Sequence, residues 1–207
     1  MLKICGAMAV AVSAGCAMGQ ISYGGYTFDD LAFADRAESN DGGTFTFNDA
    51  ASVDEALTGF TPDSGLYNIG NLTNSNDLTL YFDDLGASDA LGADIVLFDL
   101  RYSEDAYEIA VITGGVESAF LSYDAASQVN TGESHDVGAA TAWAIEIDLA
   151  SYGVVSAEAI RFRAGLSNVG NVQGDPTMAG VLAVPAPGGL AVVGVVGAMV
   201  VRRRRPR

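Results

Sequence analysis

Residues 143–149 read Trp-Ala-Ile-Glu-Ile-Asp-Leu, a stretch in which large apolar residues alternate with alanine or an acid. The same period of two runs through Leu78–Phe82 and through Ile160–Ala164, where Arg161 and Arg163 share one face. Because successive side chains of a strand point to opposite faces, this period is typical of strands buried on one side. The side chains expected to face the core from the first stretch are Trp143, Ile145, Ile147 and Leu149.

Further strand candidates follow along the middle of the chain, separated by runs of Gly, Asn, Asp and Ser that favour turns. They are Tyr23–Phe28, Thr44–Asn48, Asp94–Leu100, Tyr107–Thr113, Glu117–Tyr123 and Met178–Ala183. Ile95–Phe98 is continuously apolar, which is typical of a central strand covered on both faces. Only Ala50–Leu57 has a helical pattern. Together these patterns predict an all-β domain over residues 20–183, an antiparallel β-sandwich of jelly-roll type.

The charge of the chain is unevenly distributed. The formal net charge is −16, but six of the ten basic residues lie in the terminal segments and all 26 acids lie between Asp29 and Asp175. Four arginines against those 26 acids give the middle of the chain a net charge of −22. Such a domain repels phosphates, which argues against nucleic acid as a partner. The charge favours a solvated acidic surface suited to a saline habitat, and specific binding of divalent cations such as calcium is the alternative. Both cysteines, Cys5 and Cys16, precede the domain, which argues against disulfides or Cys-ligated zinc within it.

Residues 1–19 have the pattern of a secretory signal peptide. Lys3 supplies a positive start, the apolar run that follows is too short to span a bilayer, and small residues precede Gln20. We therefore predict a signal helix that is cleaved between Gly19 and Gln20. A lipoprotein attached at Cys16 is the alternative. A buried N-terminal helix is disfavoured because the segment has no polar face.

Residues 184–207 have three parts in order. The first is a short rigid motif, formed by Val184, Pro185, Ala186 and Pro187. The second is Gly188–Val201, which carries no charge. The third begins with a cluster of arginines, Arg202, Arg203, Arg204 and Arg205. Since the apolar run is shorter than the ~20 residues of a comfortable spanning helix, we predict an apolar helix that spans marginally, with its arginines on the cytoplasmic side.

This order resembles the PEP-CTERM tail of exosortase substrates, a removable sorting signal made of a proline-containing motif, an apolar segment and an Arg-rich end. The resemblance covers residues 184–207, although Ala186 stands where the glutamate of the name would be. It implies transient retention at the inner membrane and cleavage by an exosortase-like processing enzyme. Gly188-Gly189 is also similar to GlyGly-CTERM tails, which a rhomboid-type protease cuts. A plain single-span anchor is a further alternative.

The strand cores resemble a second family. Residues 77–84 (Asp-Leu-Thr-Leu-Tyr-Phe-Asp-Asp), 92–99, 107–111, 143–154 and 160–163 are similar to exported bacterial domains with a galactose-binding-like jelly roll. Members of that family often bind carbohydrate or carry a structural calcium ion. The resemblance therefore implies weak contacts with an exopolysaccharide or an envelope glycan. No binding residue of the family is matched to a position in this chain.

Calcium is the ligand that the residue types favour most. Ca²⁺ takes about six to eight oxygens from carboxylates, amides and backbone carbonyls. Two polar loops, residues 39–42 and 74–77, offer such oxygens at alternate positions. The predicted ligands are Asn40, Asp41, Asn76 and Asp77. Ordinary Asx-turns are the alternative for both loops.

No motif brings catalytic residues together. The one histidine, His135, lies between Ser134 and Asp136, and consecutive residues of an extended segment point to alternating sides, so the three are not a triad. Adjacent acids such as Asp83-Asp84 are expected by chance among 26 acids. Packing in the core or at its rim is the default expectation for four tyrosines, and stacking on a sugar is the alternative if they are exposed; they are Tyr23, Tyr26, Tyr102 and Tyr123.

The sequence therefore predicts an exported cell-surface or extracellular-matrix protein that is noncatalytic and is processed at a C-terminal sorting signal. We expect its contacts with carbohydrate or calcium to be weak. The alternative is a secreted polysaccharide-acting hydrolase that uses paired carboxylates.

Overall fold

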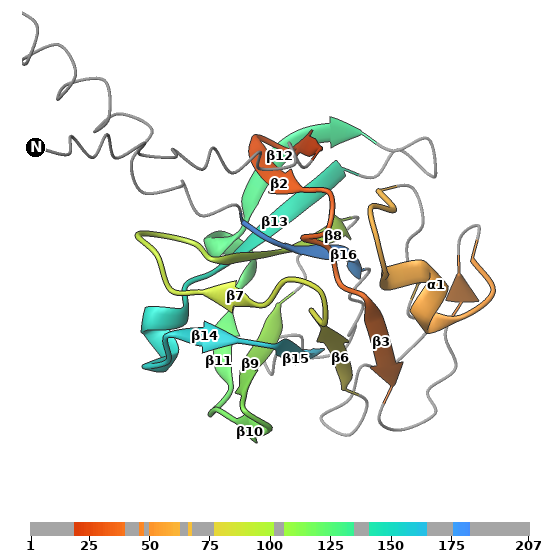
Figure 1. The fold of residues 1–207 in the computed structure, drawn as a ribbon. Helices are drawn as coiled ribbons and strands as arrows, with labels where there is room; N and C mark the ends of the chain where they lie inside the picture. The colour runs from red at the N-terminus through yellow and green to blue at the C-terminus, as the bar shows by residue number, and fades with distance from the viewer. Residues whose placement is uncertain are drawn as a thin grey trace, which may run out of the picture.

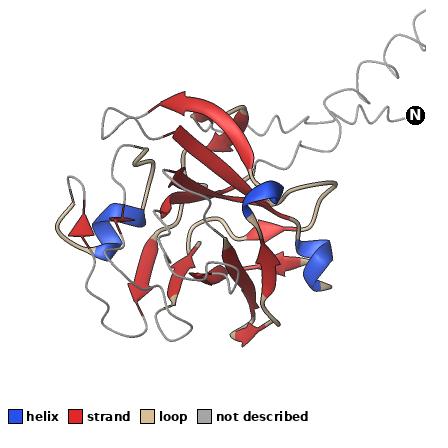
Figure 2. Cartoon of the chain, turned by 180° about the vertical axis from the view of Figure 1, so that it is seen from behind, coloured by secondary structure: helices blue, strands red, loops and turns tan. Residues whose placement is uncertain are grey.

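The computed structural model describes several stretches of the chain, and these form antiparallel β-sheets with few helices (Figure 1 and Figure 2). The described residues are 19–39, 46–47, 50–62, 66–67, 77–101, 106–134, 141–164 and 176–182. The prediction of an all-β domain is therefore confirmed. The helices expected at the two ends fall on residues outside these stretches. Within the described stretches, no helix combines the length and the hydropathy needed to cross a membrane.

The larger sheet is built from six strands. They are β3 (Arg36–Ser39), β6 (Leu78–Tyr81), β9 (Tyr107–Thr113), β10 (Val116–Glu117), β11 (Leu121–Tyr123) and β15 (Ala159–Ala164). Their order is β10-β9-β15-β6-β3, with β11 also paired to β9. On β15, Ile160 and Phe162 are fully buried while Arg161 and Arg163 lie on the other face, as the alternation predicted.

One predicted strand of this sheet is wrong. Residues 117–123 form the end of β10 and all of β11 instead of one strand. The chain breaks at Ser118, which folds back onto β9: its N–H donates to the Val111 carbonyl at 2.9 Å, and its Oγ accepts from the Val111 N–H at 3.0 Å.

The second sheet has four strands. They are β8 (Ile95–Arg101), β12 (Val129–Ser134), β13 (Thr141–Ile147) and β16 (Pro176–Val181), in the order β12-β13-β8-β16. Every side chain from Ile95 to Leu100 is at most 1% exposed, which confirms a central strand covered on both faces. Ile145, Ile147 and Leu149 are buried as predicted. Trp143 is only half-buried, because it stands opposite Asn130 on the exposed edge strand β12.

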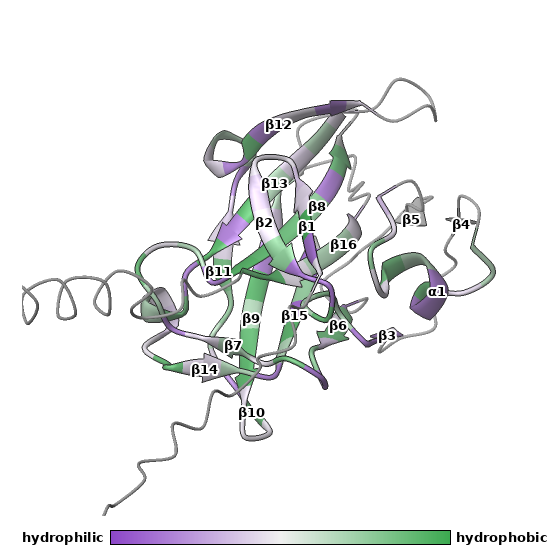
Figure 3. Cartoon of the chain, turned by 45° about the horizontal axis from the view of Figure 1, so that its top comes forward, coloured by the Kyte–Doolittle hydropathy of each residue, from purple (hydrophilic) through white to green (hydrophobic). Residues whose placement is uncertain are grey.

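Strand β12 is an irregular edge. Its register with β13 shifts between Asn130 and Ser134, and Gly132 has a positive φ of 77°. The N–H of Gly132 donates to Asn130 Oδ1 at 2.8 Å, and the N–H of Glu133 donates to Thr131 Oγ1 at 3.2 Å. Side chains of the strand therefore accept hydrogen bonds from two of its own backbone N–H groups. Most of its residues are exposed and hydrophilic (Figure 3).

A hairpin covers one face of the four-stranded sheet. It consists of β1 (Gln20–Tyr23) and β2 (Tyr26–Asp29), so the single strand predicted over residues 23–28 is wrong. Gly24 and Gly25, with φ of 60° and 88°, make the two-residue turn that this pairing requires. The Phe28 ring lies 6.0 Å from that of Phe98 on β8.

The remaining elements are short. They are β4 (Thr46–Phe47) paired with β5 (Leu66–Tyr67), β7 (Ala87–Ser88) paired with β14 (Ser156–Ala157), the 3-10 turns η1 (Ala125–Ser127) and η2 (Leu149–Tyr152), and helix α1 (Val53–Leu57). The helix begins later than the predicted residue 50 because Ser52 caps it. Ser52 Oγ accepts from the Glu55 N–H at 3.1 Å, and Glu55 Oε2 accepts from the Ala51 N–H at 2.8 Å.

One buried core draws side chains from both large sheets and the hairpin. Its largest fully buried members include Phe28, Phe98, Tyr107 and Phe162. The Tyr107 hydroxyl on β9 donates to Asp99 Oδ1 on β8 at 2.5 Å, which joins the two sheets through a buried polar contact. Burial of each large apolar side chain contributes on the order of 2 kcal/mol, so the core dominates the stability of the domain.

Candidate metal centre

Of the four predicted calcium ligands, only Asp77 lies among the described residues; Asn40, Asp41 and Asn76 do not. Asp77 precedes β6 and is 6% exposed. Its Oδ2 lies 2.6 Å from a terminal nitrogen of Arg161, whose other terminal nitrogen donates to Glu117 Oε2 at 2.8 Å. A guanidinium therefore bridges two carboxylates at this predicted position.

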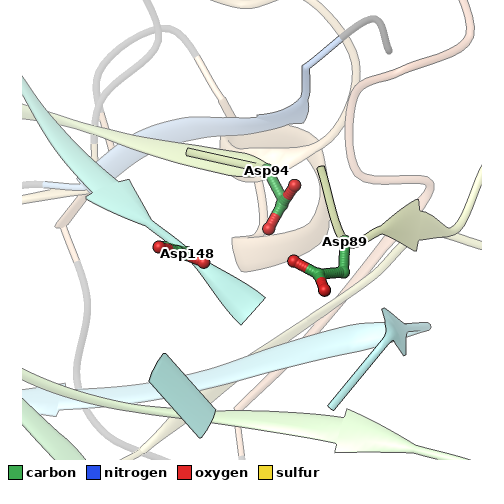
Figure 4. A group of neighbouring side chains, drawn as sticks. All are labelled: Asp89, Asp94 and Asp148. Carbon is green, nitrogen blue, oxygen red and sulfur yellow. The ribbon is translucent and has the colours of Figure 1, made fainter. Parts of the chain in front are cut away.

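The described stretches bring together a different set of acids: Asp89, Asp94 and Asp148 (Figure 4). One carboxylate oxygen of each lies within 4.8 Å of the others. Asp89 follows β7 and Asp94 precedes β8, so both belong to one loop. Asp148 lies between β13 and η2. The pairing of Ile147 with Ile95 brings the end of β13 to the start of β8 and hence Asp148 to Asp94.

Asp94 is the buried member of this three-aspartate cluster, with only 3% of its surface exposed. Its Oδ1 accepts from the N–H of Ala90 at 2.7 Å, and its Oδ2 accepts from the N–H of Leu149 at 2.9 Å. Its backbone N–H donates to the Ile147 carbonyl at 2.9 Å. These bonds fix the carboxylate between the loop before β8 and the start of η2.

The other two aspartates are more open to solvent. Asp148 is half-buried and caps η2, since its Oδ1 accepts from the Ala150 N–H at 2.9 Å. Asp89 is exposed, and its backbone N–H donates to the Val155 carbonyl at 2.9 Å. The cluster therefore has one fixed, buried carboxylate and two that reach solvent, which leaves a path for an ion to enter.

Burial raises the pKa of the Asp94 carboxyl, and the charges of Asp89 and Asp148 raise it further. The two backbone N–H groups that it accepts from act in the opposite direction. The cluster thus concentrates negative charge that either a proton or a cation relieves.

The arginines whose side chains the structure describes are all paired elsewhere. Arg161 bridges Asp77 and Glu117, Arg163 Nε lies 2.7 Å from Glu108 Oε2, and Arg36 pairs with Glu38. None of these three forms a salt bridge with the three-aspartate cluster. Three carboxylates at this spacing suit a hard divalent cation, which would complete its shell with carbonyls and water.

Sequence reasoning missed this cluster, although a signal for it was present. Asp94 stands just before one predicted strand, and Asp148 stands near the end of another. If those strands are antiparallel neighbours, the two acids meet at the same end of the sheet. The sequence does not reveal which strands are neighbours. Nor does it reveal the backbone bonds on either side of Asp89, from its own N–H to the Val155 carbonyl and from the Ala90 N–H to Asp94 Oδ1.

The tyrosines considered for sugar stacking are mostly engaged. Tyr23 is buried, with its ring 5.0 Å from that of Phe98, so it is not an exposed platform. The half-buried Tyr26 donates to Glu146 Oε1 at 2.8 Å. The hydroxyl of the half-buried Tyr123 lies 3.1 Å from that of Tyr152, and burial raises the pKa of both. Tyr102 and His135 lie outside the described residues.

An open groove with a volume of about 250 Å³ lies beside β7 and β14. It is lined by residues 86–88, 113–114 and 156–158, which include the hydroxyls of Ser88, Thr113 and Ser156. The Glu158 carboxylate at its rim accepts from the N–H groups of Gly114 and Gly115 at 3.2 and 2.7 Å. The lining of the groove is mixed, with glycine and alanine carbons beside polar groups, and the Thr113 hydroxyl donates to the Ser156 carbonyl at 2.5 Å.

The remaining predicted sites stand at the ends of the chain. Gly19 and Gln20, at the predicted cleavage site, are exposed at the start of β1. The sorting motif from Val184 to Pro187 and the cluster from Arg202 to Arg205 lie outside the described residues.

No protein-family model matches the chain, and no curated protein matches it either. Among solved structures, the chain is similar to one titled "Crystal structure of SpGH29", with 14% sequence identity and a TM-score of 0.43. The alignment covers 76% of this chain and 28% of the other chain. The chain thus spans well under half the length of the structure it matches.

Proposed function

We propose that this protein is an exported, noncatalytic cell-surface or extracellular-matrix protein whose β-domain binds calcium through Asp89, Asp94 and Asp148. The observation that carries the calcium proposal is the convergence of three carboxylates, one of them buried, while the described arginines pair with other acids. In a domain with a net charge of −22 between its terminal segments, a bound divalent cation would offset repulsion that the chain itself leaves uncompensated.

Calcium fits these ligands better than other metals. Transition metals favour imidazole and thiolate ligands, whereas the cluster offers only carboxylates. Magnesium demands near-ideal octahedral geometry and keeps several waters, while calcium tolerates the irregular oxygen sets found on loops. The same cluster fits a glycosidase less well, because both oxygens of Asp94 already accept backbone N–H groups.

Thermal denaturation tests whether the domain binds calcium. Millimolar calcium is expected to raise the melting temperature of the chelator-treated domain, and magnesium is expected to raise it much less. Asp89→Asn should abolish the calcium response without unfolding the domain, because Asp89 is exposed. Asp84→Asn, the same change at an exposed acid outside the cluster, is the matched control and should keep the response. If calcium raised the melting temperature of both variants equally, calcium would not bind at this cluster.

The proposed partner is an exopolysaccharide or an envelope glycan. The groove beside β7 and β14 supports this, since the hydroxyl, carboxylate and backbone groups in its mixed lining can hydrogen-bond to sugar hydroxyls. A glycan array with and without calcium tests binding. A reducing-sugar assay tests the alternative of a hydrolase: release of sugar that disappears on mutating a carboxylate pair would make the protein an enzyme.

The proposal extends to the detailed fold, a β-sandwich of jelly-roll type. The chain passes repeatedly between the two large sheets, from β6 to β8, back to β9, from β11 to β12, and from β13 to β15 and then β16. The shared core supports face-to-face packing. An experimental structure should have the two sheets about 10 Å apart.

Export rests on the two terminal segments. Residues 1–19 direct secretion, and residues 184–207 hold the chain transiently at the inner membrane until an exosortase-like enzyme processes it. Fractionation of cells that express the full chain tests this. Deletion of residues 184–207 should move the protein from the membrane and surface fractions to the soluble exported fraction, whereas deletion of residues 1–19 should leave it in the cytoplasm.

A further inference from the structure

The start of β1 has a hydrogen-bond pattern that matters for the mature N-terminus. Gln20 pairs with Asp29, and the flanking bond runs from the Asp30 N–H to the Gly19 carbonyl at 3.0 Å. In an antiparallel ladder, a bond between the flanking residues marks a non-hydrogen-bonded pair, whose own N–H and C=O groups point away from the partner strand. The backbone nitrogen of Gln20 therefore faces away from β2.

Cleavage after Gly19 would cost the hairpin little. It removes the carbonyl that the Asp30 N–H donates to, while the pairs from Ile21 with Phe28 to Tyr23 with Tyr26 remain. Phe28 and Tyr23 stay buried in the core and hold the hairpin in place. The new α-amine of Gln20 is then free of the ladder and exposed, next to an exposed Gln20 side chain.

We propose that Gln20 is a modification site, and that after signal cleavage it cyclises to pyroglutamate; this rests on the proposed export. The α-amine nitrogen attacks Cδ of the side-chain amide of the same residue. An N–Cδ bond forms, the bond from Cδ to Nε2 breaks, and ammonia leaves with a proton from the amine. No oxidant, reductant or co-reactant is needed, and the two groups belong to one residue, so the attack is intramolecular.

The five-membered lactam is compatible with the fold. The ring keeps the Gln20 carbonyl and the chain beyond it, so the pairing of Ile21 onward is unaffected. Its main consequence is electrostatic and protective: the N-terminus loses its positive charge and its free amine. An exported protein would thereby resist aminopeptidases that need a free α-amine.

The test uses the full chain, expressed with its leader in a bacterium that exports it. Trypsin releases an N-terminal peptide that ends at Arg36, since no lysine or arginine lies between Gln20 and Arg36. Its mass is expected to be lower, by one ammonia, than that of the uncyclised peptide starting at Gln20. Gln20→Asn is the matched control, because its shorter amide would have to close a four-membered ring. That variant should give the full mass and a free amine.

The outcomes separate this proposal from the export on which it rests. A peptide that starts at Gln20 with a free amine overturns cyclisation and leaves export intact. A mature chain that starts elsewhere, such as a lipid-modified Cys16, or one that retains residues 1–19, overturns both cyclisation and the proposed cleavage.

Discussion

Two groups of acids in this domain differ in whether an arginine of the chain pairs with them. Asp77 and Glu117 converge on Arg161, whose two terminal nitrogens lie 2.6 and 2.8 Å from their carboxylates. Asp89, Asp94 and Asp148 converge on one another within 4.8 Å, and none of the three described arginine side chains pairs with them. In the first group the cation is an arginine of the chain itself; in the second, a bound cation is the proposal made above.

The difference teaches where calcium is to be sought in so acidic a chain. The presence of an acid in a polar loop is a poor guide to a calcium site. Asp77 is such an acid and was a predicted ligand, but its carboxylate pairs with Arg161. The position of the few arginines is more informative. A carboxylate cluster without one of them is where an exchangeable ion would contribute most.

The largest effect on stability is expected from replacing Arg161, the arginine that pairs with Asp77 and Glu117. Arg161→Met keeps the aliphatic part of the side chain over the sheet but leaves Asp77 buried opposite Glu117 without the guanidinium. We expect a loss of about 3 kcal/mol in the free energy of unfolding, measured by urea denaturation. An unchanged free energy would mean that solvent, and not Arg161, compensates Asp77.

A smaller loss of unfolding free energy is expected from replacing Asp94 in the three-aspartate cluster. Asp94→Ala leaves the N–H groups of Ala90 and Leu149 without their acceptor, which should cost about 2 kcal/mol of unfolding free energy in the presence of a chelator. Calcium should no longer stabilise this variant. If calcium still raised its melting temperature as in the parent, the ion would bind elsewhere.

The third prediction concerns protons. Because the pKa of Asp94 is raised in the folded state, the stability it contributes is highest at low pH and falls as pH rises from about 4, the ordinary aspartate pKa, toward the folded value. Asp89→Asn removes one like charge and should lower the pKa of Asp94. Carboxyl carbon shifts followed by NMR, without calcium, measure it. No change in that pKa would show that the charge of Asp89 does not act on Asp94.

The smallest effect is expected at an exposed pair. Arg36 pairs with Glu38 and lies 3.8 Å from Asp83, with its side chain 43% exposed. Arg36→Met should therefore leave the midpoint of urea denaturation almost unchanged. A loss as large as that of the Arg161 variant would mean that exposure does not distinguish the two arginines.

Much of the fold was predictable because alternation is a local property. Ile160 and Phe162 are buried opposite Arg161 and Arg163, and the continuous apolar run from Ile95 is a central strand, as the pattern indicated. The strand predictions are wrong where the conformation or hydrogen bond of one or two residues ends a strand. Gly24-Gly25 turns a predicted strand into a hairpin, and Ser118 divides another.

The candidate site was less predictable because it depends on which strands are neighbours. Asp94 and Asp148 are 54 positions apart, and only the register of β8 with β13 brings them together. Asp77 was correctly placed in a loop before a strand, but its partner Arg161 comes from the neighbouring strand β15. The net charge of the middle segment shows that the domain is acidic, but it does not show which acids lie together.

The irregular edge strand β12 has a consequence for how the protein behaves when crowded. A regular edge would offer a row of free backbone donors, on which a second molecule could add a strand and start a fibril. Here Asn130 and Thr131 already accept from the backbone of Gly132 and Glu133, and the register shift bends the edge. Densely packed copies should therefore not add strands to one another along β12.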